Sequence, residues 1–204
     1  MILEAPLTKR EIATRERRRF ILETAIACFA EKGFHQTGMR DIAKRAEVSL
    51  GNLYNHFSGK HDMLVGLAEW EAEAFAQFAI LLSRDTPTQQ VLKAFIHQYY
   101  DYASEQNAAI LNLEIVAEAM RHPDIADLFL KSRNTLASSL AALITRGIQV
   151  GLYKPATSTE EAAKFILDLI ENAAGRNIID RGNPNHEKRQ LETFVLCALN
   201  HQSE

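Results

Sequence analysis

Residues 37–57, TGMRDIAKRAEVSLGNLYNHF, predict two short helices joined by a tight turn. Ala43 lies where two crossing helices would approach closely, Val48 fills the turn, and Leu53 is the core residue of the second helix. These spacings are typical of a helix-turn-helix. The turn normally has glycine where the backbone is left-handed. Here that position is Glu47, which would cost about 1–2 kcal/mol in that conformation.

The predicted second helix carries the side chains that a helix-turn-helix would present to the major groove. Asn52 is the best candidate for reading a base, because an asparagine amide can pair bidentately with adenine. Gly51 keeps the helix thin, while Tyr54 and His56 have polar tips suited to phosphate oxygens, although both could instead close the small core. The candidate DNA-binding residues in this segment are Thr37, Arg40, Leu50, Gly51, Asn52, Tyr54, Asn55 and His56.

A basic run lies upstream of this segment. Arg15, Arg18 and Arg19 fall at i, i+3 and i+4 of a predicted helix and therefore share one face. One interpretation of this face is phosphate neutralisation, and the other is a solvated surface paired with neighbouring glutamates. The nearby helix-turn-helix favours the phosphate interpretation, and Lys60 could add a further contact to the DNA backbone.

The charge is unevenly distributed along the chain. The whole sequence has a formal charge of −3, which by itself gives no sign of a nucleic-acid partner. Residues 1–60 carry eleven basic and seven acidic side chains, a formal charge of +4, whereas residues 61–204 carry −7. A protein with a basic N-terminal segment and an acidic remainder would be oriented by these charges as it approached DNA, with the basic segment toward the phosphates.

The composition is typical of a folded chain outside the membrane. The 204 residues are 47% hydrophobic and 24% charged. No stretch of about 18 uncharged apolar residues occurs, so we expect no signal peptide, no membrane span and no membrane partner. Cys28 and Cys197 lie in apolar helical patterns and are expected to be free thiols, which favours a reducing, cytoplasmic location.

Helical periodicity extends along the whole chain and predicts an all-α fold of about nine helices. We expect an N-terminal three-helix helix-turn-helix DNA-binding domain at residues 1–58 and a helical effector-binding and dimerisation domain at residues 59–204. The predicted helices cover residues 9–32, about 39–46, 50–56, 60–83, 88 onward, 105–120, 124–150, 158–179 and 185–199.

The second domain offers candidates for a pocket and for a dimer interface. A pocket needs an apolar lining with a few polar groups, while the apolar helices 162–179 and 190–199 suit either a four-helix interface between subunits or ordinary packing within one. The candidate effector-binding residues are Trp70, Phe75, Phe78, His97, Tyr100, Asn112, Glu114, Met120, Phe165, Leu169 and Asn172. The candidate dimer residues are Phe165, Ala173, Ala174, Gly175, Leu191, Phe194 and Val195.

Patterns for catalysis and metal binding are weak. Glu114, Glu118 and His122 share one helix face, as do His97 and Asp101, but a di-metal site in a bundle needs Glu-x-x-His spacing on two helices. No nucleophile elbow, phosphate-binding loop or H-E-x-x-H motif occurs. We therefore expect no catalytic residue, no metal ligand and no cofactor. A bundle metalloenzyme and a helix-turn-helix protein without an effector are the alternatives.

The stretch RDIAKRAEVSLGNLYNHFSGKHDML, residues 40–64, resembles the DNA-binding domain of TetR-family transcriptional regulators. The family pattern is I-A-x-x-A-G-V-S-x-G-x-L-Y-x-H-F followed by a lysine. This sequence matches it at positions 42, 43, 46, 48, 49, 51, 53, 54, 56, 57 and 60.

The resemblance implies a homodimer of Ω-shaped all-helical subunits that binds a palindromic double-stranded DNA operator. By residue-wise correspondence it implies DNA contacts from Arg40, Asn52, Tyr54, His56 and Lys60. It further implies repression that is relieved when a small-molecule effector binds the C-terminal domain and changes the separation of the two recognition helices.

Overall fold

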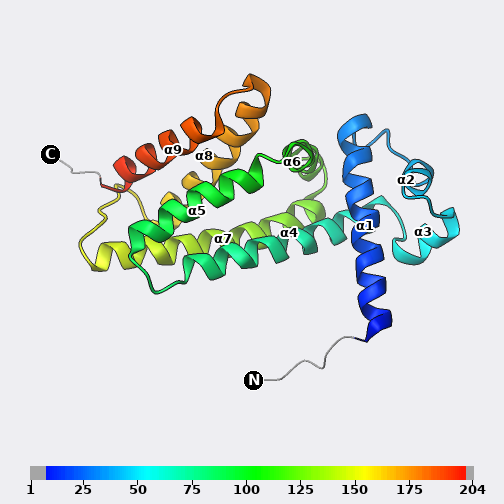
Figure 1. The fold of residues 1–204 in the computed structure, drawn as a ribbon, viewed down its shortest axis with the longest axis horizontal. Helices are drawn as coiled ribbons and strands as arrows, with labels where there is room; N and C mark the ends of the chain where they lie inside the picture. Colours follow the sequence, from blue (N-terminus) through cyan, green and yellow to red (C-terminus); the bar gives the residue numbers. More distant parts are fainter. Residues whose placement is uncertain (1–7, 201–204) are drawn as a thin grey trace. The chain divides into compact units, whose positions relative to one another are not determined.

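The computed structural model describes residues 8–200, with the backbone alone for residues 106–108 and 111. Within these ranges the regular structure is entirely helical, which confirms the predicted all-α class. None of the described helices has the length and apolar character needed to cross a membrane. Figure 1 labels the helices, which are α1 (Lys9–Lys32), α2 (Met39–Arg45), α3 (Leu50–His56), α4 (Lys60–Leu82), α5 (Thr88–Ala103), α6 (Gln106–Ala119), α7 (Pro123–Gln149), α8 (Thr159–Asp180) and α9 (Pro184–Leu199).

The chain divides into two compact units, residues 1–67 and residues 68–204. The domain boundary expected from the sequence, between residues 58 and 59, falls just before α4. The division by contacts instead falls within α4, between Leu67 and Ala68. The first two turns of α4 therefore pack with the N-terminal unit.

The first unit is built on α1, and both ends of this helix are defined by local interactions. The Thr8 hydroxyl accepts a hydrogen bond from the Glu11 N–H at 3.3 Å, and the Glu11 carboxylate accepts one from the Thr8 N–H at 2.7 Å. Gly33 ends the helix with a φ of 82°. The second half of α1 completely buries Ile21 and Phe29, while the first half is exposed except for the half-buried Arg18.

Polar contacts orient α2 against the end of α1. The Lys32 ammonium pairs with the Asp41 carboxylate at 2.9 Å, and Arg45 pairs with Glu31 at 2.5 Å. Asp41 also accepts a hydrogen bond from the Gly38 N–H at 2.9 Å, which satisfies one of the first amides of α2. The hydrogen bond from Lys32 lowers the pKa of the Asp41 carboxyl below its usual value.

The turn between α2 and α3 has the predicted backbone. The Val48 N–H donates to the Ala43 carbonyl at 3.0 Å. Glu47 has a φ of 52°, which confirms that this glutamate occupies the left-handed position. Ser49 then caps α3, because its hydroxyl accepts a hydrogen bond from the Asn52 N–H at 3.1 Å.

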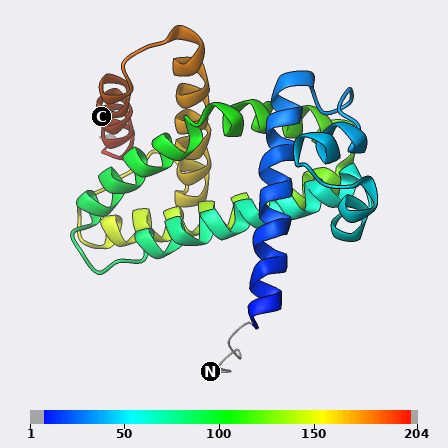
Figure 2. The same cartoon turned by 45° about the vertical axis from the view of Figure 1, so that its right-hand side comes forward.

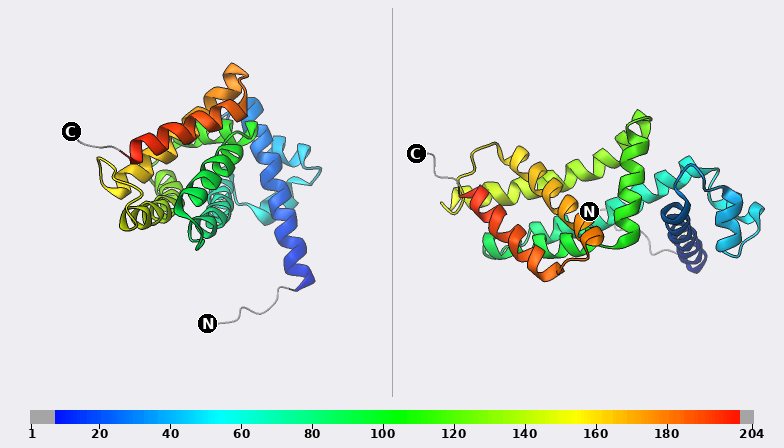
Figure 3. Two further views of the ribbon diagram at one scale, coloured as in Figure 1. Left: turned by 60° about the vertical axis from the view of Figure 1, so that its left-hand side comes forward. Right: turned by 90° about the horizontal axis from the view of Figure 1, so that it is seen from above.

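The second unit is organised around α8, which packs against α5, α7 and α9. Figures 2 and 3 show α8 and α9 side by side, connected by a short turn. Leu140, Leu167 and Ile170 are completely buried in the core of this unit. Arg146 links α7 to the end of α4 by donating a hydrogen bond to the Leu82 carbonyl at 2.5 Å.

We predict that Glu47→Gly raises the free energy of unfolding by about 1 kcal/mol, because glycine adopts left-handed backbone without the steric cost that a Cβ imposes. Urea denaturation followed by circular dichroism measures this change.

The matched control is Glu16→Gly, which makes the same exchange at an exposed position inside α1. There glycine is expected to lower stability by about 1 kcal/mol relative to a good helix former. Equal destabilisation by both substitutions would contradict the assigned strain at Glu47.

Candidate functional site

α3 has an inward and an outward side. Leu53 is completely buried, whereas its neighbour Tyr54 is 49% exposed. The structure leaves Gly51, Asn52, Tyr54 and Asn55 exposed and places Leu50 and His56 half-buried at the two ends of the helix. Most of the side chains predicted to face DNA on α3 thus lie on one accessible surface.

Among the residues that the structure describes, none makes a contact that requires glycine at position 51. A Cβ at Gly51 would meet no heavy atom within 4 Å, whereas one at Gly66 in α4 would lie 3.2 Å from Phe57 and 3.3 Å from Leu22. Glycine inside a helix costs about 1 kcal/mol relative to alanine. The open position leaves room for another molecule to approach the first turn of α3 closely.

Arg18 holds α1, α3 and α4 together within the N-terminal unit. Its guanidinium donates a hydrogen bond to the His56 carbonyl at 2.7 Å, lies 4.2 Å from the Phe57 ring centroid and approaches the Asp62 carboxylate at 3.9 Å. The His56 carbonyl is at the C-terminal end of α3, where backbone oxygens lack helical partners and attract cations. The contacts of Arg18 are therefore internal, although the sequence suggested a phosphate contact.

Two further candidates for DNA binding also make internal contacts. The Lys60 ammonium donates to the Phe34 carbonyl at 2.7 Å and lies 4.6 Å from the centroid of the Phe34 ring. Thr37 is buried, with its hydroxyl within hydrogen-bonding distance of the Cys28 carbonyl at 3.1 Å and the Gly33 carbonyl at 2.8 Å. Both residues stabilise the connection between α1 and the helix-turn-helix.

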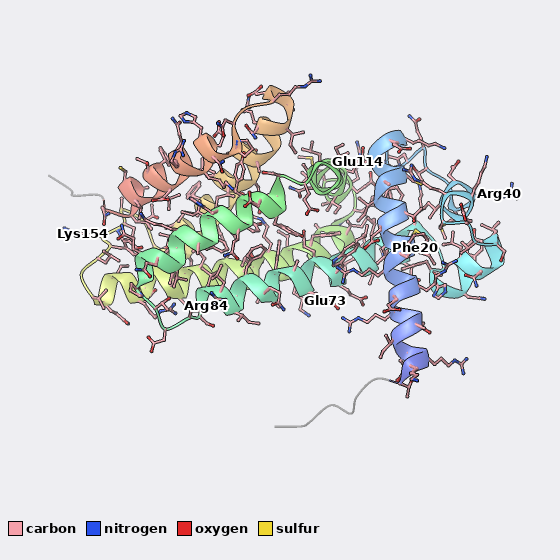
Figure 4. The ribbon with its side chains drawn as sticks, in the orientation of Figure 1. Phe20, Arg40, Glu73, Arg84, Glu114 and Lys154 are labelled. Carbon is pink, nitrogen blue, oxygen red and sulfur yellow. The ribbon has the colours of Figure 1, made fainter. Side chains whose placement is uncertain are left out.

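The other predicted cations are more accessible. Arg15 and Arg19 are exposed on α1, where Arg19 approaches Glu23 at 3.7 Å. Arg40 is exposed on α2 (Figure 4), and its side chain makes no hydrogen bond or ion pair with the part of the chain that the structure describes. Its charge is therefore available to an external anion.

In the second unit, two of the predicted effector-binding residues take part in an aromatic cluster. Phe75 and Phe78 of α4 lie with their ring centroids 5.2 to 6.1 Å from those of Tyr99 and Tyr102 of α5. We call these four residues the aromatic cluster. The other predicted effector-binding residues lie outside this cluster and differ in burial. Tyr100 is buried, and Trp70, His97 and Glu114 are half-buried. Asn112, Met120 and Asn172 are exposed, and Phe165 and Leu169 lie on the surface of α8.

A charged network lies beside the aromatic cluster. The Tyr99 hydroxyl donates to one oxygen of Glu171 at 2.5 Å, and Arg133 donates to the other at 3.1 Å. Arg133 also pairs with Asp168 at 2.8 Å. Glu171 therefore has two strong hydrogen-bond donors.

The Glu71 carboxylate has fewer and weaker hydrogen-bond donors than the Glu171 carboxylate. The only hydrogen bond of its carboxylate among the described residues comes from the Ser132 hydroxyl at 3.1 Å. That hydroxyl has one proton and also lies 3.0 Å from the Phe129 carbonyl, which competes for it. Burial raises the pKa of the Glu71 carboxyl to about 7. The hydrogen bond from Ser132 is the next largest effect and lowers this pKa, while the charge of Glu171 raises it and that of Arg133 lowers it by smaller amounts.

Sequence reasoning did not select Glu71, Ser132, Arg133 or Glu171. One local signal was present, because Glu71 precedes Phe75 by one helical turn and so shares a face with a residue that was selected. The other three lie on α7 and α8, and no spacing along the chain connects them to α4.

The surface formed by α8 and α9 contains an apolar hollow of about 300 Å³. Phe165 and Phe194 line it and are 67% and 64% exposed, which is unusual for phenylalanine. Of the other predicted dimer residues, Ala173 and Gly175 are half-buried, while Ala174, Leu191 and Val195 are buried in the core of the unit. A Cβ at Gly175 would meet no heavy atom within 4 Å, as at Gly51.

The residues considered for metal binding make other contacts. Glu118 is buried and pairs with Arg121 at 3.1 Å, with His122 at 3.9 Å. His97 lies 3.2 Å from Glu192. Among the described residues, no three histidine, cysteine or acidic side chains are grouped in a way that could hold a metal ion.

Comparisons with known proteins match both units. The sequence model for bacterial regulatory proteins of the tetR family matches residues 21–67, and the model for the C-terminal region of BetI-type transcriptional repressors matches residues 88–196. The transcriptional regulator UidR of Escherichia coli strain K12 is 28% identical over 150 residues, which covers 73% of this chain and 75% of UidR.

Two solved structures have the same fold. The regulator FadR of Bacillus subtilis in complex with stearoyl-CoA superposes with a TM-score of 0.76 at 21% identity, covering 89% of this chain and 99% of FadR. A regulator of Saccharomonospora viridis in complex with choline superposes with a TM-score of 0.72 at 23% identity, covering 89% of this chain and 96% of that protein.

We predict that Arg18→Ala lowers the free energy of unfolding by about 2 kcal/mol, because it removes a charge-assisted hydrogen bond to His56 and the cation–π contact with Phe57. Arg40→Ala is the control for loss of an arginine and is expected to change stability by less than about 0.5 kcal/mol. Urea denaturation of both variants tests the assignment, and an unchanged Arg18→Ala variant would contradict an internal role.

Proposed function

The chain belongs to the tetR family of bacterial regulatory proteins, and on that premise we propose that it is a homodimeric repressor that leaves a palindromic DNA operator when a small molecule binds its C-terminal unit. Its curated relatives are transcriptional regulators, and we place no catalytic step in it. We place the protein in the cytoplasm, where its operator would be accessible.

The observation that carries the DNA-binding proposal is the exposed first turn of α3. Gly51 and Asn52 are exposed there, with open space in place of a Cβ at Gly51. A recognition helix uses this turn to reach base edges in the major groove. Asn52 has the donor and acceptor that pair with adenine, so we assign it to base reading.

We assign phosphate contacts to exposed groups around this turn. Arg40 at the start of α2 and Tyr54 on α3 are exposed, as are Arg15 and Arg19 on α1. Arg18 and Lys60 instead hold the backbone of the unit in place through the His56 and Phe34 carbonyls. Their contribution to DNA binding would be indirect, through the position of α3.

A second copy of the chain is the partner that fits the surface of α8 and α9. The hollow of about 300 Å³, flanked by Phe165 and Phe194, is apolar and would accept side chains of the same surface in a two-fold arrangement. The open position at Gly175 would allow a partner helix to approach closely. A dimer would present two α3 helices to half-sites about 34–36 Å apart.

The proposed effector response depends on α4, which passes from one unit into the other. A molecule bound beside α4 in the second unit would favour one position of this helix. It would shift the balance between the operator-binding and free forms, typically by about 1–3 kcal/mol. Effector and operator would then weaken each other's binding.

We predict that Asn52→Ala relaxes the base preference at one operator position, since each well-placed bidentate contact contributes about 1–3 kcal/mol of discrimination. Arg40→Ala should weaken binding to operator and random DNA alike and reduce the salt dependence by about one unit. Fluorescence anisotropy with the sequence upstream of the gene and with base-substituted versions measures both effects. Equal losses on specific and random DNA for Asn52→Ala would contradict its role in base reading.

We predict that Phe194→Glu converts the dimer into a monomer, because it places a charge in the centre of the proposed apolar interface. Size-exclusion chromatography with light scattering at about 10 μM protein measures the mass. The control is Ile80→Glu, which introduces the same charge at an apolar residue of α4 that is 57% exposed. A wild-type monomer, or loss of the dimer in both variants, would argue against the assigned interface.

A further inference from the structure

The outward side of α3 is centred on Gly51 and Asn55. A helix turns by about 100° per residue, so these two positions lie nearly opposite the buried Leu53. Asn52 and Tyr54 lie on the two flanks of this centre, and both are exposed. The middle of the surface that α3 presents is therefore a position without a side chain followed, one turn later, by a short side chain.

This surface carries two side-chain amides that are not used within the chain. The amides of Asn52 and Asn55 make no hydrogen bond with any residue that the structure describes. The Ser49 hydroxyl accepts from the backbone N–H of Asn52, which leaves the side chain of Asn52 unengaged. The two asparagines are about 4.5 Å apart along the helix axis and about 60° apart around it. Both amides can therefore face the same neighbouring molecule.

α3 carries none of the charged side chains that read guanine or cytosine. Its seven residues, LGNLYNH, include no lysine, arginine, aspartate or glutamate. In the major groove, arginine and lysine are the usual partners of guanine, and carboxylates accept a hydrogen bond from cytosine. Asparagine instead pairs with the N6 and N7 atoms of adenine. The amides of Asn52 and Asn55 are therefore both suited to adenine.

The cations closest to α3 are engaged inside the first unit. Lys32 and Arg45 form ion pairs with acidic side chains. Arg18 and Lys60 donate hydrogen bonds to backbone carbonyl oxygens. The exposed cations of α2 lie on the helix that crosses the DNA backbone in a helix-turn-helix. The groups left to face the base edges are those of α3 itself.

The open position at Gly51 matches the short reach of the asparagines. An asparagine amide lies directly beyond the Cβ atom, so it meets a base edge only when the helix itself comes close to the bases. A Cβ at Gly51 would meet no heavy atom of the chain within 4 Å, and its absence removes the group that would hold the helix away. Glycine at 51 and asparagine at 52 and 55 thus serve the same close approach.

An apolar side chain lies beside these amides. Leu50 is the first residue of α3 and is half-buried, on the flank opposite Asn52. Thymine presents its C5-methyl group in the major groove, where apolar side chains contact it. Cytosine would instead place its amino group against Leu50, which has no acceptor for it. Leu50 therefore also favours an adenine–thymine pair.

We propose that α3 reads adenine–thymine pairs, with Asn52 and Asn55 each pairing with an adenine and Leu50 contacting a thymine methyl group. The inference rests on the proposed function, because it names the base pairs of its operator. Each half-site then contains at least two adenine–thymine pairs, adjacent or one pair apart. This spacing follows because the two asparagines are about 4.5 Å apart along α3 and stacked base pairs are about 3.4 Å apart.

The test begins with a randomised duplex library. The full-length protein selects from duplexes of about 40 base pairs, which span two half-sites one helical turn apart, and the enriched sequences are read by sequencing. We expect an inverted repeat in which at least two adenine–thymine pairs of each half-site are strongly preferred. Half-sites in which guanine–cytosine pairs carry the discrimination would overturn the proposal.

Base analogues in the selected duplex separate major-groove contacts from effects of DNA shape. 7-Deazaadenine lacks the N7 acceptor of the major groove and should weaken binding at least about fivefold at each contacted adenine. The control, 3-deazaadenine, lacks the N3 acceptor of the minor groove and should change the Kd less than about twofold. If no adenine is sensitive to 7-deazaadenine, the preference comes from DNA shape and the proposal is overturned.

Variants of α3 assign each contact to a residue. Asn55→Ala should relax the preference at one adenine–thymine pair at least about fivefold, at a different pair from Asn52→Ala, and should abolish the effect of 7-deazaadenine there. The matched control is Asn134→Ala, which removes an exposed asparagine from α7 and should change the Kd less than about twofold. An Asn55→Ala variant with unchanged discrimination at every position would overturn the second adenine contact.

The contact of Leu50 has a separate readout. Replacing the contacted thymidine by deoxyuridine removes only the methyl group and should weaken binding about two- to fourfold. Leu50→Ala should remove this dependence on the methyl group, because the apolar partner is gone. Equal sensitivity to deoxyuridine in the wild-type protein and in Leu50→Ala would overturn this contact.

Failure of the inference is separable from failure of the proposed function. A protein that enriches an inverted repeat discriminated at guanine–cytosine pairs would still bind an operator, and only the inference would be overturned. A protein that enriches no sequence from the random library would contradict the proposed function and the inference together.

Discussion

The position of α3 depends on the guanidinium group of Arg18. This one side chain donates to the His56 carbonyl at the end of α3, covers the Phe57 ring and approaches Asp62 at the start of α4. A helix of seven residues is too short to be stable alone and takes its orientation from such contacts. The outward side of α3 can vary to suit an operator because the inward side and the helix end are held elsewhere.

The glycines within the helices are of two kinds: some are required by packing within the chain, and others lie where another molecule could approach. A Cβ at Gly147 in α7 would collide with the Tyr153 ring, and one at Gly66 would crowd Phe57 and Leu22, so packing explains both glycines. Gly51 and Gly175 face open space. Glycine weakens a helix. A glycine inside a helix that no packing within the chain explains therefore favours contact with another molecule at that position. The two positions lie on the surfaces assigned here to DNA and to a second subunit.

The fold leaves the chemistry of the effector open. Two proteins of similar fold are known with ligands of different chemistry, stearoyl-CoA in one and choline in the other.

Local patterns in the sequence predicted the helices and the left-handed Glu47, because capping, periodicity and turn geometry involve residues within a few positions of one another. They also predicted that Gly51, Asn52, Tyr54 and Asn55 of α3 face outward, whereas Leu50 and His56, predicted with them, are half-buried. The contacts of Arg18 and Glu71 required the tertiary structure. Arg18 meets His56 across 38 residues, Glu71 meets Ser132 across 61, and Tyr99 meets Glu171 across 72. No periodicity encodes contacts at such separations, because they arise only when packing brings distant helices together.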